Sequence, residues 1–368
     1  MPKILSANPT QNTFKSLFFF RSLDSFIKTV IVTFLLIFLA TPFIVTNLEI
    51  PTPEAQGRLA PTPTPTPTPT LISTSPGTVV EKSVEACGSD CKVYELGVTC
   101  QGIPERIIDV RERTPAGPSK GTIFFGTGGW SIDYYPADIL GYADSEGFQT
   151  YNLKWTGVEG WGTGAGDAGY KKAMCGYAAI VKWVKDNGIA TNSNVMCATG
   201  NSAGSFQIAF GLSVYGLEDY LDMVILTGGP PISRLDTACF TVGDPAYWPT
   251  VLWGRGTTDY MLGYVQSRNE VTGPCVKSDG SNPAVVLDFQ NESLASPTEY
   301  RDYDFPGTKV NFVNSVNDIT IADEQGKIYY GLISSQKSWY DIPGRKHNVY
   351  TTAAGSAKIK ELFVNECK

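Results

Sequence analysis

The chain has 368 residues, a formal net charge of −7 at pH 7, eight cysteines and one histidine. Its length allows one large domain or two small ones. Its acidic balance argues against nucleic acid and anionic membrane surfaces as binding partners. With a single histidine, the zinc-binding interpretation of the cysteines is weak, and no metal is expected.

The N-terminal segment has the composition of an export signal. Residues 1–28 carry more basic than acidic side chains, and residues 29–48 carry no charge. A helix of that second length spans about 30 Å, enough to cross a bilayer. The basic excess predicts a cytoplasmic N-terminus with the rest of the chain outside. The long apolar stretch without a small-x-small site favours a retained signal anchor, and a cleaved signal peptide remains the alternative.

Residues 49–78 are rich in proline and threonine, including the run PTPTPTPTPT. Because proline fixes φ and lacks an N–H, this tract predicts an extended extracellular linker. The folded domain is expected at 79–368, and all eight cysteines lie within it. An even cysteine count on the exported side predicts disulfides, with Cys175 and Cys197 alternatively plain buried thiols. The expected location is therefore extracytoplasmic, either membrane-anchored or secreted.

Beyond the linker, strand and helix patterns alternate. Short apolar or alternating runs predict strands at 92–100, 106–113, 121–125, 148–155, 194–199, 223–229, 309–313 and 337–342. Helical periodicity predicts helices at 170–187, 202–216, about 322–333, and near the C-terminus. This alternation indicates an α/β fold with a mainly parallel sheet covered on both faces. Residues 230–307 lack periodicity and are expected to form an inserted cap or lid.

A serine lies in the turn between the strand at 194–199 and the helix at 202–216. The sequence there reads Gly-Asn-Ser-Ala-Gly, with Ser202 at its centre. A tight strand-to-helix turn requires small neighbours and presents the hydroxyl at the end of the sheet. The motif is common by chance, and its position between a strand and a helix is what makes Ser202 a candidate nucleophile.

A nucleophilic serine needs a base and an acid that orients the base. His347 is the one histidine of the chain and lies in a loop before the last helix. Asp318 follows the strand at 309–313 and is the first candidate for the acid, with Asp236 and Asp323 as alternatives. Asp318 could instead cap the helix that begins nearby.

The oxyanion of an acyl-transfer intermediate needs backbone N–H donors. Ala203 follows the serine directly, and the glycine-rich segment 126–130 follows the strand at 121–125. We expect donors at Ala203, Gly128 and Thr127, although glycines after a strand can also form an ordinary turn.

Together these features resemble the α/β-hydrolase superfamily: a serine, an acid and a histidine in that order, a glycine-rich loop and an inserted lid. The resemblance runs from about residue 90 to the C-terminus, and the segment 126–130 lacks the His-Gly pair that many esterases carry there. It implies Ser202 as nucleophile, Asp318 as acid and His347 as base. The implied function is an extracytoplasmic serine hydrolase that cleaves a small or polymeric carboxylic ester through an acyl-enzyme. A peptidase or amidase of the same fold, a non-catalytic surface binding module and a stalked structural protein are the alternatives.

A second glycine motif points elsewhere. Residues 164–169 read G-x-G-x-x-G before a helix, as dinucleotide sites do. The acidic residue at the expected distance, Asp186, ends that same helix instead of a second strand, so no cofactor is expected. A rim of the active-site cleft is the preferred interpretation. The cleft could be lined by tryptophans that could equally pack in the core: Trp155, Trp161, Trp248 and Trp253.

Overall fold

The computed structural model describes residues 76–191, 195–248 and 253–367. Its strands are β1 (Thr78–Ala86), β2 (Cys91–Cys100), β3 (Ile103–Arg113), β4 (Thr122–Gly126), β5 (Gln149–Trp155), β6 (Met196–Asn201), β7 (Met223–Thr227), β8 (Lys309–Ser315) and β9 (Lys337–Ile342). Its α-helices are α2 (Ala137–Ser145), α3 (Gly169–Asp186), α4 (Ala203–Tyr215), α5 (Leu235–Phe240), α6 (Trp253–Met261), α7 (Pro274–Lys277), α8 (Pro283–Glu292), α9 (Ala322–Leu332) and α10 (Ala353–Glu366). Short 3₁₀ turns cover Gly160–Gly162, Leu217–Asp219 and Val349–Thr351.

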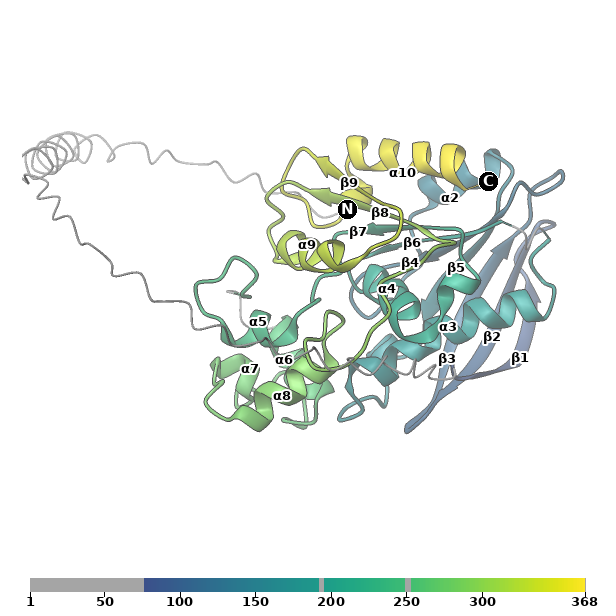
Figure 1. Ribbon diagram of the computed structural model, residues 1–368. Helices are drawn as coiled ribbons and strands as arrows, with labels where there is room; N and C mark the ends of the chain where they lie inside the picture. Colours follow the sequence, from purple (N-terminus) through teal and green to yellow (C-terminus); the bar gives the residue numbers. More distant parts are fainter. Residues whose placement is uncertain (1–75, 192–194, 249–252, 368) are drawn as a thin grey trace, which may run out of the picture. The chain divides into compact units, whose positions relative to one another are not determined.

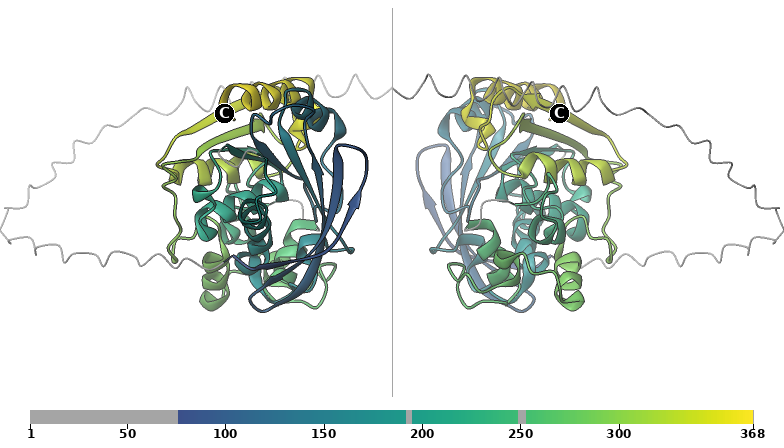
Figure 2. Two further views of the ribbon diagram at one scale, coloured as in Figure 1. Left: turned by 90° about the vertical axis from the view of Figure 1, so that its right-hand side faces the viewer. Right: turned by 90° about the vertical axis from the view of Figure 1, so that its left-hand side faces the viewer.

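In the described part of the chain the strands form one nine-stranded sheet in the order β1-β2-β3-β5-β4-β6-β7-β8-β9. Strands β1, β2 and β3 pair antiparallel at one edge, which Figure 2 shows as long ribbons. From β5 to β9 all pairs are parallel. The mainly parallel α/β architecture expected from the sequence is confirmed.

Helices cover both faces of the parallel part (Figure 1). Helices α2 and α10 lie on one face, and α3, α4 and α9 lie on the other. Strand β7 is an example of a strand that is buried on both faces. Met223 and Ile225 belong to the core under α2 and α10, whereas Val224 and Leu226 belong to the core on the opposite face. Since successive side chains point to opposite faces, a strand buried on both sides is apolar at successive positions, as in residues 223–226.

Most predicted elements are observed within a few residues. The sequence prediction missed strand β1, which begins at Thr78. It also missed helix α2, which has nine residues and ends shortly before Gly147, where the chain turns with a positive φ. It also missed the four helices α5 to α8 between β7 and β8. These helices have four to ten residues, too short for helical periodicity to stand out. We call residues 230–307 the insertion; that it acts as a lid remains a prediction.

Disulfides tie distant elements together. All eight cysteines lie in the described part and pair as Cys87–Cys91, Cys100–Cys175, Cys197–Cys367 and Cys239–Cys275. The interpretation of Cys175 and Cys197 as plain buried thiols is therefore wrong: each lies opposite a cysteine from a distant segment. A disulfide typically contributes about 2–4 kcal/mol to stability by restricting the unfolded chain.

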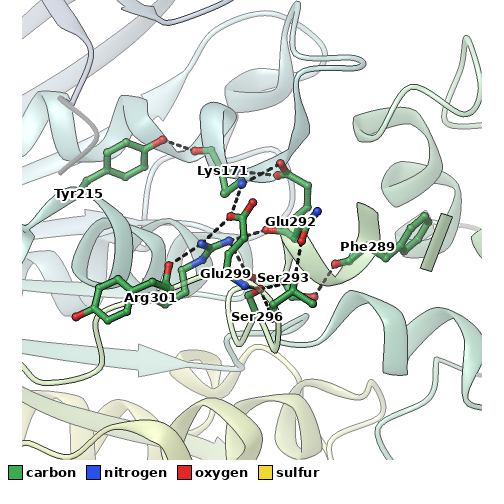
Figure 3. A network of polar contacts seen from close by, with 11 residues as sticks. Lys171, Tyr215, Phe289, Glu292, Ser293, Ser296, Glu299 and Arg301 are labelled. Carbon is green, nitrogen blue, oxygen red and sulfur yellow. Dashed lines mark hydrogen bonds and ion pairs between the residues drawn. The ribbon is translucent and has the colours of Figure 1, made fainter. Parts of the chain in front are cut away.

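A partly buried polar network connects the insertion to the start of α3 (Figure 3). The Glu292 carboxylate of α8 accepts a hydrogen bond from the backbone N–H of Lys171, 2.9 Å away. The Lys171 ammonium lies 2.6 Å from Glu299, which also pairs with Arg301 at 3.0 Å. Burial raises the pKa of Glu292, and the lysine partly opposes that shift. An anion at a helix N-terminus is stabilised by the helix dipole, so this contact fixes α8 against α3.

The glycine motif at 164–169 lies under the insertion. A Cβ on Gly166 would lie 2.8 Å from the Tyr260 ring, and one on Gly169 would lie 2.5 Å from the Glu292 carboxylate. A dinucleotide phosphate would need the helix N-terminus that Glu292 occupies. The glycines therefore permit close packing of the insertion on α3.

The segments predicted as cytoplasmic (1–28), membrane-spanning (29–48) and most of the linker (49–78) lie outside the described residues. Among the helices within 76–367 that the structure describes, none is both long and apolar enough to span a bilayer.

Candidate active site

Ser202 lies at the turn where β6 ends and α4 begins. Its backbone adopts φ 53° and ψ −114°, a conformation that L-residues rarely take. Such strain costs on the order of 1–3 kcal/mol and persists only where the surroundings impose it. Here the Ser202 N–H donates to the Thr227 carbonyl of the neighbouring strand at 2.8 Å. This is the strained turn that the sequence motif predicts.

The glycines on either side of the serine are required by backbone contacts. A Cβ on Gly200 would lie 2.4 Å from the carbonyl carbon of Gly204, and a Cβ on Gly204 would lie 2.4 Å from the Gly126 oxygen. Real Cβ atoms do not approach backbone that closely. The motif thus reflects the crossing of α4 over the ends of β6 and β4.

His347 and Asp318 are brought together from loops 29 residues apart in sequence. The His347 Nδ1 lies 2.9 Å from the Asp318 Oδ2, and the Asp318 side chain is fully buried. The other carboxylate oxygen accepts from the N–H of Thr320 at 2.8 Å and from its hydroxyl at 3.0 Å. Burial opposes ionisation of Asp318, but these donors and the imidazole outweigh it and hold its pKa below the ordinary value.

The two other acids considered from the sequence have different partners. Asp236 pairs with Arg234 at 2.7 Å in the insertion. Asp323 pairs with Lys327 at 2.7 Å along α9. The capping alternative for Asp318 is also not realised, because α9 begins at Ala322 and no side chain caps it.

Ser202 and His347 line the same cavity. A hydrogen bond between Asn201 and Asn348, at 3.0 Å, joins the residue before the serine to the residue after the histidine. A Cβ on Gly228, whose φ is 54°, would lie 2.6 Å from the His347 carbonyl oxygen. In the described part of the chain the Ser202 hydroxyl and the imidazole are not hydrogen-bonded, and such contacts often form only in the substrate complex.

The loop after β4 turns its carbonyl groups toward the protein interior. The Thr127 carbonyl accepts from the Ser131 hydroxyl at 2.7 Å, and the Gly128 carbonyl accepts from the Ser131 N–H at 2.9 Å. The Gly129 carbonyl accepts from the Trp161 indole at 2.8 Å. In a trans peptide the C=O and the following N–H point in opposite directions. The N–H groups of Gly128 and Gly129 therefore point away from these interior partners.

The predicted oxyanion donors lie beside the serine. A Cβ on Gly128 would lie 3.2 Å from the Ser202 Cβ, and Gly128, Thr127 and Ala203 all line the cavity. The hydroxyl of Thr127 donates to the Asp133 carbonyl at 2.9 Å. Within the described residues, the N–H groups of Gly128 and Ala203 donate to no other protein group.

Sequence reasoning missed the residues that support this loop. Gln207 on α4 donates to the Ser131 hydroxyl at 3.1 Å and accepts from the Trp155 indole at 3.1 Å. The sequence also did not indicate that the Trp161 indole would donate to the Gly129 carbonyl or that Thr320 would donate to the Asp318 carboxylate. Nothing local distinguishes a supporting glutamine or threonine from any other, because their partners lie on distant segments.

The cavity has a volume of about 420 Å³. Of the tryptophans proposed as lining residues, Trp161 and Trp248 line it. Trp155 packs in the core and does not line the cavity, and Trp161 belongs to the same core cluster while also lining the cavity. The side chain of Trp253 lies outside the described residues. Trp161 itself is only 3% exposed, whereas Asp133 and Asn348 at the cavity are exposed.

No family model and no curated protein matches this chain. Solved structures similar to it include acetyl xylan esterase 1 from Thermoanaerobacterium sp., at 15% identity and a TM-score of 0.49, with 78% of this chain and 88% of that chain covered. A bacterial heroin esterase is 19% identical, with a TM-score of 0.45 and coverage of 75% and 83%. A dienelactone hydrolase from Anabaena variabilis is 13% identical, with a TM-score of 0.43 and coverage of 76% and 100%.

The fold is identified by features of the chain itself. In the parallel part of the sheet the strand order is β5-β4-β6, so the chain crosses over between these strands. A strained turn at Ser202 leads from the central strand β6 into α4. Asp318 follows β8 and His347 follows β9, the last two strands of the sheet. In this order of elements and of serine, acid and histidine, the chain has the α/β-hydrolase fold.

Proposed function

We propose that the protein is a serine hydrolase that cleaves carboxylic esters through an acyl-enzyme on Ser202. The observation that carries the proposal is the Asp318–His347 pair, held at 2.9 Å beside the cavity that contains the strained serine. An alcohol is a weak nucleophile near neutral pH and needs an adjacent base. His347 is the one histidine of the chain, and it lines the cavity that contains Ser202.

The proposed reaction begins with the imidazole tautomer. If His347 Nδ1–H donates to Asp318, Nε2 is left as an acceptor and can take the proton of the Ser202 hydroxyl. The serine oxygen then forms a bond to the ester carbonyl carbon, whose π electrons move onto the oxygen. When that intermediate collapses, the alkoxide leaves and takes the proton from His347. Water repeats the sequence on the acyl-enzyme, releasing the acid and restoring Ser202.

The oxyanion is stabilised in this proposal by the N–H groups of Ala203 and Gly128. The N-terminus of α4 adds favourable helix-dipole potential at the same place. Both groups are fixed before the substrate binds, so no reorganisation is needed when charge develops. Removing one such donor typically lowers kcat by about 10²–10³.

We also propose that residues 79–368 act outside the cytoplasm, held by a signal anchor at 29–48 on the linker 49–78 or released by cleavage. The four disulfides support this location, because cytosolic thiols are kept reduced. The insertion at 230–307 is proposed to cover the cavity, and Ile232 and Trp248 contribute to its lining.

The test uses the full chain produced in an oxidising compartment. Hydrolysis of p-nitrophenyl esters and labelling by a fluorophosphonate are measured for the wild type, Ser202→Ala and His347→Ala. Both activities should disappear in Ser202→Ala, and His347→Ala should lower both by at least about 10³. Ser145→Ala, at an exposed serine on α2, is the matched control and should behave as wild type.

A folded wild type that neither turns over esters nor reacts with the fluorophosphonate would support a binding module in place of an enzyme. Labelling with turnover of amides but not of esters would support a peptidase or amidase, which uses the same groups.

A further inference from the structure

The residue before the serine and the residue after the histidine are joined through their side chains. The Asn201 amide donates to the Asn348 side-chain oxygen at 3.0 Å. Asn201 is fully buried at the end of β6, whereas Asn348 is exposed and lines the cavity. Each asparagine is the chain neighbour of one proposed catalytic residue. This hydrogen bond therefore connects Ser202 to His347 across the two loops by the shortest route.

The Asn201 amide is itself held from the neighbouring strand. Its Oδ1 lies 3.0 Å from the Thr227 hydroxyl, which is also 3.0 Å from the Gly200 carbonyl. Thr227 is fully buried, and its own carbonyl accepts from the Ser202 N–H at 2.8 Å. Since the amide oxygen faces the Thr227 hydroxyl, the amide NH₂ is directed at Asn348. The side chain is thus fixed to the same strand that holds the strained serine turn.

The loop that carries the imidazole has few other attachments. Its residues 343–346 are all exposed. Among the hydrogen bonds of the described residues, this loop is fastened to distant segments at two places. One is the imidazole, which faces Asp318 and Thr320, and the other is Asn348, which accepts from Asn201. The first contact places the base relative to its acid, and the second places the loop relative to the serine turn.

The separation of the serine and the imidazole is set across this second contact. A base must come within about 2.6–3.2 Å of the hydroxyl whose proton it takes. The loop runs close to Asn201, because a Cβ on Gly228 would lie 3.1 Å from the Asn201 Oδ1 and 3.3 Å from the His347 Cε1. A misplacement of about 1 Å can lower a rate about 100-fold. Without the Asn201 bond, the imidazole would keep its acid and lose its hydrogen-bonded reference to the serine.

We infer that Asn201 is a positioning residue whose amide holds the His347 loop at the separation from Ser202 that proton transfer requires. This inference rests on the proposed serine-hydrolase function. Of the two asparagines, Asn348 lines the cavity and Asn201 lies behind it. Loss of the Asn201 amide should therefore slow the chemical step and leave the affinity for substrate nearly unchanged.

The test measures hydrolysis of p-nitrophenyl acetate and the rate of fluorophosphonate labelling by the full-length wild type, Asn201→Ala, Asn348→Ala and the double variant. Each single variant should lower kcat and the labelling rate about 10–100-fold, and KM of Asn201→Ala should change less than about threefold. Because both substitutions remove the same bond, the double variant should be within about threefold of the slower single variant. Asn348 is exposed, so Asn348→Ala provides the measurement even if Asn201→Ala does not fold.

Asn311→Ala is the matched control. Asn311 is a fully buried asparagine on β8 outside the cavity lining, and its amide donates to Glu366 of α10 at 2.7 Å. Its replacement should leave kcat, KM and labelling within about threefold of wild type. In ¹⁵N NMR of the one imidazole, the proton should stay on Nδ1 in Asn201→Ala, because the contact with Asp318 is kept. A fall in kcat with an unchanged tautomer separates misplacement of the base from loss of its acid.

The outcomes distinguish this inference from the function on which it rests. A wild type that neither turns over the ester nor is labelled means that the proposed function itself fails. If the wild type is active and both folded single variants stay within about threefold of it, the hydrolase stands and the positioning role is wrong. Losses that multiply in the double variant, or an equal loss in Asn311→Ala, would also contradict positioning through this bond.

Discussion

Replacing Asp318 with asparagine tests the proposed base through its tautomer. One carboxylate oxygen accepts two hydrogen bonds from Thr320, and the other faces His347 at 2.9 Å. In Asp318→Asn, the amide oxygen is expected to keep the Thr320 donors, which directs the NH₂ toward the imidazole. Nδ1 must then accept, so Nε2 carries the proton and cannot take the one from Ser202.

The contacts of Thr320 set the size of the effect. The flipped amide would place its NH₂ against the Thr320 N–H, leaving a buried donor unsatisfied at a cost of about 1–3 kcal/mol. The flipped, competent orientation is then populated at only about 0.6–16%. Loss of the negative charge opposite the imidazolium adds to this. We therefore expect kcat to fall by between about 10²-fold and 10⁴-fold, with KM nearly unchanged.

Two measurements check this reasoning. Steady-state kinetics give kcat, and ¹⁵N NMR of the imidazole reports the tautomer. His347 is the one histidine of the chain, so its imidazole signals need no assignment. The proton should lie on Nδ1 in the wild type and on Nε2 in Asp318→Asn. Asp236→Asn and Asp323→Asn are matched controls that should leave both unchanged. A folded Asp318→Asn variant with kcat within threefold of wild type would refute the assignment of the acid.

Three further predictions concern the surroundings of the site. Gly204→Ala should lower the free energy of unfolding by at least about 1–3 kcal/mol in urea, because its Cβ meets backbone at 2.4 Å, whereas Gly141→Ala on α2 meets nothing within 4 Å and should not destabilise. Gln207→Leu should lower kcat about tenfold with little change in KM, because Ser131 loses the hydrogen bond that helps to orient the loop after β4, where the proposed oxyanion donor Gly128 lies; equal changes in both parameters would contradict a positioning role. Burial raises the pKa of Glu218 from 4.5 to about 7. The folded state then binds more protons than the unfolded chain, so stability falls as pH rises from about 4.5 to 7. Glu218→Gln should remove this loss and be about 1–3 kcal/mol more stable than wild type at pH 8. The check is Tm measured from pH 4.5 to 8 for both proteins, and an equal dependence of Tm on pH in the two would contradict the prediction.

The expectations for the core strands and long helices agree with the structure because their signals are local. Residues 223–226 of β7 are all apolar because the strand is buried on both faces. Helix α3 is amphipathic because one side of it packs on the sheet and the other side is more exposed. The insertion is different. Its helices are short and held by the Cys239–Cys275 disulfide and by contacts such as Glu292 with the start of α3. Such elements depend on tertiary partners, and even the amphipathic α6 has only nine residues, too few for its pattern to be decisive in the sequence.

For the candidate site, the sequence by itself determined which residues have the required chemistry. Ser202 lies in a strand-to-helix motif and His347 has no competitor, since residue type and local pattern decide both. Only the tertiary structure decided that Asp318, and neither Asp236 nor Asp323, faces the imidazole. It also decided that the carbonyls of the loop after β4 turn inward, the pairing of the cysteines and the aromatic lining of the cavity. These are contacts between segments far apart in the chain, and their partners are set by how the sheet and helices pack, which no local pattern encodes.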